Sequence, residues 1–234
     1  MIKALLLDFN GVIIDDEHLQ MEAYRDVLKD EGIDLTEEKY FGCLGMNDEV
    51  FLKTIYKGEG KEVETVKLPE LIEAKTGKWR EKIEKEIPIF EGVYDFIKRM
   101  ENDFTLGLVS MARRPEIEYV LDTTGLKNSF SAIISAEDIS TVKPDPECYR
   151  EGFRLIDLSR TLQGKVPITR RQCVVIEDSP QGIIAGKKVR LNTLGVTNTV
   201  EAKKLREAGA DAVTHSLKDW FPDSFREVFS KISY

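Results

Sequence analysis

The sequence has few of the residues that build disulfide frameworks or histidine metal sites. Its 234 residues include only three cysteines, Cys43, Cys148 and Cys173, which are odd in number and widely spaced. We therefore expect buried free thiols in a reducing cytoplasm rather than disulfides or a CxxC metal site. The two histidines, His18 and His215, are too few and too far apart to suggest a histidine metal site.

Long apolar segments and blocks of like charge are also missing. No apolar run approaches the roughly 20 residues needed to cross a bilayer, and the first residues lack the pattern of a signal peptide. The net charge is −8, and Lys and Arg are spread along the chain. These features favour a cytoplasmic protein that binds neither nucleic acid nor a membrane. The absence of a heptad run argues only against a coiled-coil assembly. We expect a monomer, although other oligomers stay open.

The residues that are present indicate a globular α/β protein. The composition is 41% hydrophobic and 32% charged, which is ordinary for a chain with a sizeable core. Continuous apolar runs, typical of strands buried on both faces, occur at 3–9, 105–110, 131–136, 173–178, 192–196 and 211–215. Amphipathic helical patterns lie between them at 93–100, 115–125, 146–156 and 200–209. This alternation predicts a parallel sheet with helices on both faces.

One interval breaks the alternation of strands and helices. Residues 16–88 contain helical patterns at 21–32 and 68–86 but no convincing strand. A segment of about 70 residues is too long for a simple loop in a compact domain. We therefore predict a small helical domain inserted after the first strand.

Polar side chains gather where the predicted strands end. Asp8 follows the first strand, Ser110 ends the second, and Glu177 and Asp178 end the fourth, while Lys143 precedes a helix at the same edge. In an open parallel sheet, ligands bind beyond the carboxyl ends of the strands. Carboxylates there could hold a hard cation such as Mg²⁺, and a serine and a lysine could hold phosphate oxygens.

Each of these residues also has a purely structural interpretation. A single aspartate after a strand is usually a turn or a helix cap. Ser179 and Pro180 are typical of a helix start, as N-cap and first-turn residues. The functional hypothesis depends on all of the polar residues converging on one edge of one sheet.

The chain resembles the haloacid dehalogenase superfamily in four ordered segments: "DFNGV" (8–12), "LVS" (108–110), "VKPDP" (142–146) and "VIEDSPQGIIAG" (175–186). More narrowly, the whole chain resembles the β-phosphoglucomutase and phosphoglycolate phosphatase-like branch. The resemblance implies a Rossmann-like catalytic core of residues 1–15 and 89–234, with an inserted α-helical cap at 16–88. It also implies bound Mg²⁺ and phosphoryl transfer through an aspartyl phosphate.

The same resemblance implies a role for each residue at the sheet edge. Asp8 would be the nucleophile and a metal ligand, Asn10 would offer its backbone carbonyl to the metal, and Asp178 would be a third ligand with Glu177 beside it.

Two further residues would bind the transferring phosphoryl group. By the same resemblance, these are Ser110 and Lys143. Lys143 would also keep Asp8 ionised, because a nearby cation favours the charged form of a carboxyl.

Asn10 departs from the pattern of the catalytic members. In the phosphatases and mutases of the family this position is an aspartate that protonates the leaving oxygen and then accepts a proton. An amide cannot do this, and general acid–base catalysis is typically worth about 10²–10⁴-fold. Four explanations stay open: an inactivating laboratory substitution, a slow or non-catalytic natural member, replacement of the acid by one of Asp15, Asp16 and Glu17, or deamidation at the Asn10–Gly11 step.

The cap is expected to select the substrate, a small phosphorylated metabolite. β-Phosphoglucomutases carry an arginine for the distal phosphate where this chain has Asn47 and Asp48. Lys75 matches a cap lysine of the family, and Arg113 or Arg114 could bind a second anionic group.

The sequence thus predicts a Mg²⁺-dependent phosphatase acting on a small phosphomonoester, such as a sugar phosphate, and slowed by Asn10. A β-phosphoglucomutase-like phosphosugar mutase is one alternative. A catalytically impaired member that binds a phosphorylated ligand is another.

Overall fold

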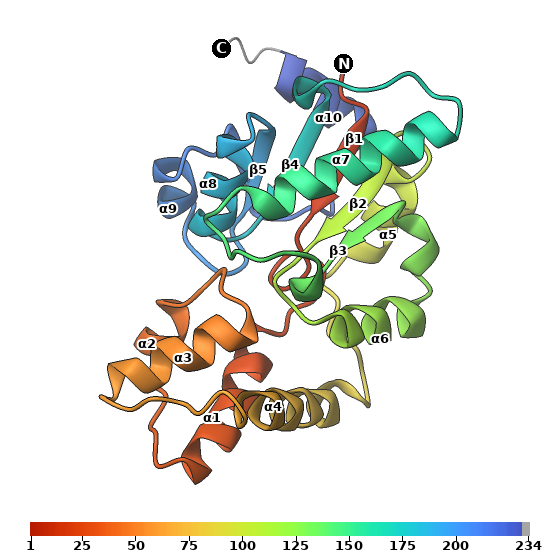
Figure 1. The fold of residues 1–234 in the computed structure, drawn as a ribbon. Coiled ribbons are helices and arrows are strands. Elements are labelled where there is room, and N and C mark those ends of the chain that lie inside the picture. The colour runs from red at the N-terminus through yellow and green to blue at the C-terminus, as the bar shows by residue number, and fades with distance from the viewer. Residues whose placement is uncertain (231–234) are drawn as a thin grey trace.

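A computed structural model describes residues 1–230 and shows a six-stranded sheet with helices on both faces (Figure 1). The strand order is β3-β2-β1-β4-β5-β6, and every adjacent pair is parallel. The strands are β1 (Ala4–Leu7), β2 (Thr105–Val109), β3 (Ala132–Ile134), β4 (Cys173–Glu177), β5 (Asn192–Val196) and β6 (Ala212–Thr214). Each lies within one of the six predicted runs, so the parallel α/β fold expected from the sequence is confirmed.

Apolar side chains on both faces of the central strands explain why the runs are continuous. Leu5 and Leu7 pack into the core under α5 (Val93–Met100), α6 (Arg114–Thr124) and α10 (Pro222–Ser230). Ala4 and Leu6 pack on the other face, under α7 (Glu147–Leu162) and α8 (Pro180–Lys188). The remaining core helices are α9 (Ala202–Glu207) and three 3₁₀ turns, Lys127–Ser129, Ala136–Asp138 and Arg170–Gln172.

Four of the five helices between β1 and β2 form a separate group, which we call the cap helices. They are α1 (Glu17–Asp30), α2 (Glu37–Phe41), α3 (Asp48–Gly58) and α4 (Leu68–Ile83). They lie beyond the carboxyl ends of the strands (Figure 1) and share their own apolar cluster, which includes Tyr24, Leu28, Phe51, Leu52 and Leu71. The boundaries of the inserted domain, 16 and 88, stay a prediction.

Side-chain caps explain where two of these helices begin. The Asn47 side chain accepts a hydrogen bond from the Val50 amide at 3.0 Å, and the Thr36 side chain accepts one from Lys39. Such caps satisfy amide groups that the first turn of a helix leaves unpaired. The same chemistry starts α8, where Ser179 is the N-cap as predicted.

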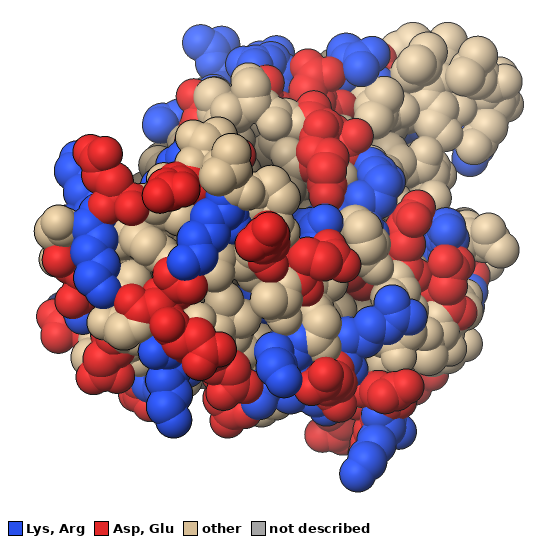
Figure 2. Space-filling view, turned by 60° about the horizontal axis from the view of Figure 1, so that its bottom comes forward, with Lys and Arg blue, Asp and Glu red and all other residues tan. Residues whose placement is uncertain are grey.

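The surface and the thiols add two observations. Lys and Arg side chains are interspersed with Asp and Glu on the face shown in Figure 2. Within residues 1–230, no helix is long and apolar enough to cross a membrane.

Cys43, Cys148 and Cys173 are free and buried, which agrees with the expectation of buried thiols.

Candidate active site

The strand register places the polar residues at one edge of the sheet. Leu7 is level with Leu108 of β2 and with Ile176 of β4. Asp8 and Glu177 come one residue after this paired row, and Ser110 comes two residues after it. All three therefore lie at the carboxyl end of the sheet. The Asp8 amide continues the ladder by donating to the Ile176 carbonyl at 3.0 Å.

Lys143 joins two of the acidic residues at this edge. Its Nζ lies 2.8 Å from Asp8 Oδ2 and 2.6 Å from Glu177 Oε1. Lys143 is only 3% exposed. Burial by itself would lower the pKa of Lys143, but the two carboxylates outweigh this effect and raise it. The lysine is therefore held as a cation against Asp8.

Glu177 is held by more donors than any other carboxyl in this cluster. Besides Lys143, the Tyr149 hydroxyl donates to Oε1 at 2.6 Å, and the Ser179 hydroxyl donates to Oε2 at 2.9 Å. Burial opposes ionisation, yet the charge of Lys143 lowers the pKa of Glu177. A Cβ at Gly182 would lie 1.8 Å from Glu177 Oε1, so the start of α8 closes directly over this carboxylate.

Three buried carboxyls at the edge could hold a cation. Asp8, Glu177 and Asp178 each offer an oxygen, and these oxygens lie within 4.8 Å of one another. Burial, with the charge of Glu177 adding to it, raises the pKa of both Asp8 and Asp178 well above the usual range. The expectation that Lys143 keeps Asp8 ionised is therefore wrong for the site without a cation, because burial outweighs the charge of the lysine. A cluster whose negative charge is so poorly compensated is stabilised by a positive ion, and an all-oxygen donor set suits a hard one.

Gly11 allows the chain to pass against this cluster. Its φ is +71°, and a Cβ there would lie 1.9 Å from Asp178 Oδ2. A side chain at this position would both strain the backbone and displace a candidate metal ligand.

The Asn10 side chain has a partner that the sequence did not reveal. Its Nδ2 lies 3.0 Å from both carboxylate oxygens of Asp16. Asp16 is completely buried and also accepts hydrogen bonds from Gln20 and Trp79. It occupies the N-cap position of α1, but its side chain makes no capping hydrogen bond. Burial raises the pKa of Asp16 to about 6 despite these donors.

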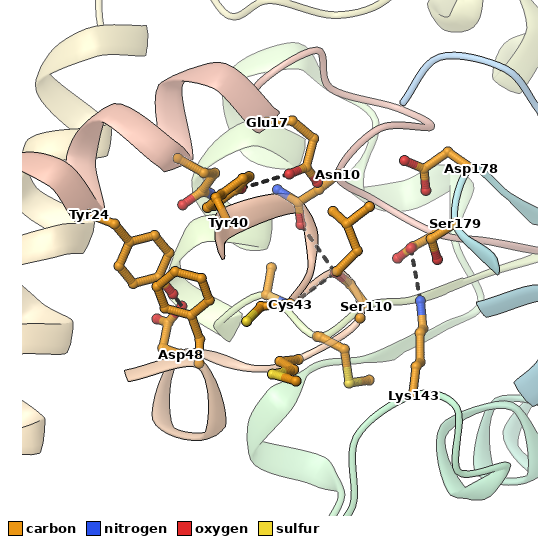
Figure 3. Close-up of a pocket in the computed structure, with 18 of the residues that line it drawn as sticks. Asn10, Glu17, Tyr24, Tyr40, Cys43, Asp48, Ser110, Lys143, Asp178 and Ser179 are labelled. Atoms are coloured by element: carbon orange, nitrogen blue, oxygen red, sulfur yellow. Dashed lines mark hydrogen bonds and ion pairs between the residues drawn. The ribbon is translucent and has the colours of Figure 1, made fainter. Parts of the chain in front are cut away.

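The three acids that follow the first strand have different surroundings. Asp15 is exposed, and Asp16 faces Asn10. Glu17 lines the pocket between core and cap together with Asp8. Figure 3 shows Glu17 next to Asn10 in this pocket. Among these three acids, Glu17 alone borders the pocket.

Glu17 is also set to change its charge near neutral pH. Its Oε2 accepts a hydrogen bond from the Tyr40 hydroxyl at 2.6 Å. Burial, with the charge of Asp16 adding to it, raises the pKa of Glu17 from 4.5 to about 7.

This pKa predicts a pH-dependent effect of Glu17→Gln on stability. The folded state holds the Glu17 proton more tightly, so this residue makes the wild type lose stability as pH rises from 4.5 to about 7, and the variant lacks this contribution. We expect the variant to unfold with a free energy about 2 kcal/mol higher at pH 8, after allowance for solvent screening. The gain should vanish below pH 4.5.

Urea unfolding in EDTA at pH 4.5 and pH 8 measures this difference. Glu22→Gln, which removes an exposed acid from the same helix, is the matched control. An equal effect of Glu17→Gln at both pH values would contradict the prediction.

Three basic residues were predicted to bind substrate, and the structure separates them. Lys75 lines the pocket, with its Nζ 3.0 Å from Asp48 and 2.9 Å from Glu116. Arg113 and Arg114 do not line this pocket.

The side chains of Arg113 and Arg114 form hydrogen bonds with residues outside the pocket. Arg113 donates to Glu73 and Thr76 of α4 at 3.0 Å each. Arg114 donates to Asp138 and to the Ile133 carbonyl. In this conformation neither guanidinium is available to an anion in the pocket.

Several pocket and support residues were not predicted from the sequence. The Tyr149 hydroxyl donates to Glu177, and the Thr199 hydroxyl donates to Asp178. Glu116 of α6 forms an ion pair with Lys75. Tyr149 lies only six residues after Lys143, in the helix that follows this lysine. Its position could therefore have indicated that it lies near the site. Thr199 and Glu116 come from distant segments and carry no local signal.

Comparisons with known proteins agree with this arrangement. The sequence profile of the family described as haloacid dehalogenase-like hydrolase matches residues 5–196. Hexitol phosphatase B of Escherichia coli K12 is 28% identical over 225 residues, which cover 93% of this chain and 94% of that protein. The phosphorylated carbohydrates phosphatase of Thermotoga maritima is 26% identical over 214 residues, covering 91% and 94%.

The fold is also shared with solved structures. The β-phosphoglucomutase of Clostridium difficile superposes with a TM-score of 0.85 at 21% identity, over 99% of this chain and 98% of that one. At this identity the likeness shows the fold, whereas the profile match over most of the chain shows the family. The chain belongs to the haloacid dehalogenase-like hydrolases, a family of enzymes.

Proposed function

We propose that the chain is a Mg²⁺-dependent phosphatase that acts on a small phosphomonoester, such as a sugar phosphate, through Asp8. The observation that carries the proposal is the ion pair of 2.8 Å between Lys143 and Asp8, which line one pocket together with Ser110. A carboxyl beside a fixed ammonium and a hydroxyl suits attack on a phosphoryl group once a bound cation favours its ionised form. The names of the relatives, which include a hexitol phosphatase and a carbohydrate phosphatase, support this substrate class.

The metal would be held by the carboxylates of Asp8 and Asp178 and by the backbone carbonyl of Asn10. Glu177, whose oxygens already accept from Lys143, Tyr149 and Ser179, would act mainly by positioning Lys143. When bound, Mg²⁺ supplies positive charge that offsets the negative charge of the phosphoryl oxygens.

The protein's own groups account for the bond changes. Asp8 attacks phosphorus while the bond to the ester oxygen breaks, which leaves a phosphoryl group on Asp8 and frees the alcohol. Water then attacks phosphorus and releases phosphate, regenerating Asp8. Ser110 and Lys143 donate to the phosphoryl oxygens and stabilise the charge they carry.

Glu17 is the best-placed residue for proton transfer. The leaving oxygen needs a proton and the attacking water must lose one, and Asn10 can do neither. Glu17 lines the pocket and has a pKa of about 7, so both of its protonation states are populated at neutral pH. We therefore assign to Glu17 the acid and base steps of a slow hydrolysis.

A phosphosugar mutase is the second candidate, and its chemistry would use the same Asp8. A mutase holds two phosphates at once, whereas this pocket presents the acids Asp48 of the cap and Glu116 of α6. The negative charge of these two acids would repel a second phosphate, so it favours the phosphatase over the mutase.

Removal of the metal tests the proposal directly. With a panel of sugar phosphates, we expect phosphate release in Mg²⁺ to fall by at least about 10²-fold in EDTA and to recover when Mg²⁺ is restored. Equal rates in both would contradict the metal's role. Tight binding of an ester without phosphate release would instead identify a binding protein, and conversion of one isomer into another would identify a mutase.

A further inference from the structure

The Asn10 amide is fixed in one orientation by its neighbours. Its Nδ2 donates to both carboxylate oxygens of Asp16 at 3.0 Å. An ionised carboxyl only accepts hydrogen bonds, so the NH₂ group of the amide, and not its oxygen, must face Asp16. Asn10 Oδ1 therefore points the other way, and Figure 3 shows it directed towards Ser110. On that side the amide presents an acceptor.

Asp16 is held in turn by two further donors. It is completely buried, and it accepts from Trp79 Nε1 at 2.7 Å and from Gln20 Nε2 at 3.0 Å. An indole N–H can only donate, so Trp79 requires an acceptor at this place. Three donating side chains thus surround one carboxyl, and together they keep its oxygens directed at Asn10.

Lys75 fixes the orientation of Gln20. The buried Lys75 Nζ donates to Gln20 Oε1 at 3.1 Å. Because an ammonium group has no acceptor, the oxygen of the Gln20 amide faces Lys75 and its NH₂ group faces Asp16. A chain of donors and acceptors therefore runs from Lys75 through Gln20 and Asp16 to Asn10, and it determines the direction of each amide along the way.

The Asn10 oxygen has capacity for another hydrogen bond. Within residues 1–230, the one donor bonded to it is the Ser110 hydroxyl, at 3.5 Å, which is too long for a strong bond between two oxygens. An amide oxygen has two lone pairs. Asn10 lines the same pocket as Asp8, so a group bound at Asp8 would lie near this acceptor.

We propose that Asn10 Oδ1 accepts a hydrogen bond from the water that attacks the phosphoryl group on Asp8, and that Asp16 positions this oxygen. The inference rests on the proposed function, since it concerns the second step of the same reaction. The water oxygen forms its bond to phosphorus as the bond between phosphorus and Asp8 breaks. One water proton passes to Glu17, and the other, which bonds to Asn10, stays on the released phosphate.

Replacement of Asp16 by asparagine should reverse the Asn10 amide. Gln20 and Trp79 would still donate to the one remaining oxygen, so the new NH₂ group would face Asn10. The Asn10 oxygen would turn to that group and leave an N–H in the pocket, where the water needs an acceptor. We expect Asp16→Asn to slow the loss of phosphate from Asp8 by about tenfold, which is the scale of one hydrogen bond.

The decay of the phosphoenzyme measures this step directly. Each protein is loaded from radiolabelled acetyl phosphate in Mg²⁺, chased with the unlabelled compound, and quenched with acid after increasing times. Acetate leaves without needing a proton, so the loading step does not depend on an acid. Asp15→Asn, the same exchange at a neighbouring exposed acid, is the matched control and should decay like the wild type.

Asn10→Ala distinguishes positioning from a purely structural role of Asp16. It removes the acceptor but keeps the backbone carbonyl, so it should slow the decay about as much as Asp16→Asn does. It also tests the acceptor if Asp16→Asn does not fold. In the Asn10→Ala background, Asp16→Asn should slow the decay no further, because its effect passes through Asn10. A purely structural role would slow the decay equally in both backgrounds.

The outcomes separate this inference from the proposed function. A phosphoenzyme that decays at the wild-type rate in Asn10→Ala or in Asp16→Asn would overturn the role of the Asn10 oxygen and leave the phosphatase intact. Equal slowing by Asp16→Asn in both backgrounds would overturn its positioning role. A wild type that forms no phosphoenzyme and releases no phosphate from any ester would overturn the phosphatase, and the inference with it.

Discussion

Asp8→Asn is expected to lower phosphate release by at least about 10⁴-fold, which is the scale of loss when a covalent nucleophile is removed. The amide is a poor nucleophile and carries no charge to pair with Lys143. The substitution should not unfold the protein, because it removes one of three clustered buried carboxyls and Lys143 keeps its bond to Glu177.

Phosphate release and thermal unfolding in EDTA measure these two effects. We expect the unfolding midpoint of Asp8→Asn to equal or exceed that of the wild type, since burial and Glu177 disfavour the charge on Asp8. Asp15→Asn, which changes an exposed acid of the same segment, should keep both activity and midpoint. Activity retained by Asp8→Asn would place the nucleophile elsewhere.

Exchanging Asn10 and Asp16 is expected to produce the largest gain. The double variant Asn10→Asp/Asp16→Asn puts a carboxyl where the family has its acid and base, and keeps an amide opposite it as donor. Because general acid–base catalysis is worth about 10²–10⁴-fold, we expect kcat/KM to rise within that range. The intact mass of the wild type, measured first, excludes activity from a deamidated fraction.

The single variant Asn10→Asp should gain less and be less stable. Its new carboxyl would face Asp16 where the Asn10 amide now donates at 3.0 Å to both oxygens. Two buried carboxyls at that distance must share a proton. The thermal midpoint should therefore fall in the single variant and recover in the double variant. If the exchange leaves the rate unchanged, Glu17 already supplies the proton fully.

Much of the fold could be predicted because its strands are local features. Each buried strand is a short continuous apolar run, and parallel pairing follows from the helices between the runs. Short helices such as α2 and α3, and the C-terminal α10, were not predicted. Their starts depend on single capping residues such as Thr36 and Asn47, which give a weaker signal than apolar periodicity.

The polar edge of the sheet was also largely predictable. Asp8, Ser110 and Asp178 end or follow strands, and strands of a parallel sheet end at the same edge. Their positions along the chain were therefore enough to place them together.

The cap end of the site was decided by tertiary structure. Glu116 of α6 meets Lys75 of α4, and Asn10 meets Asp16, only because the cap helices pack against the core. Helix packing depends on how whole faces fit, and a sequence without that packing does not reveal which charges become neighbours. The sequence by itself determined the sheet, its polar edge and the family. The tertiary structure decided which acids are buried, which are paired, and which line the pocket.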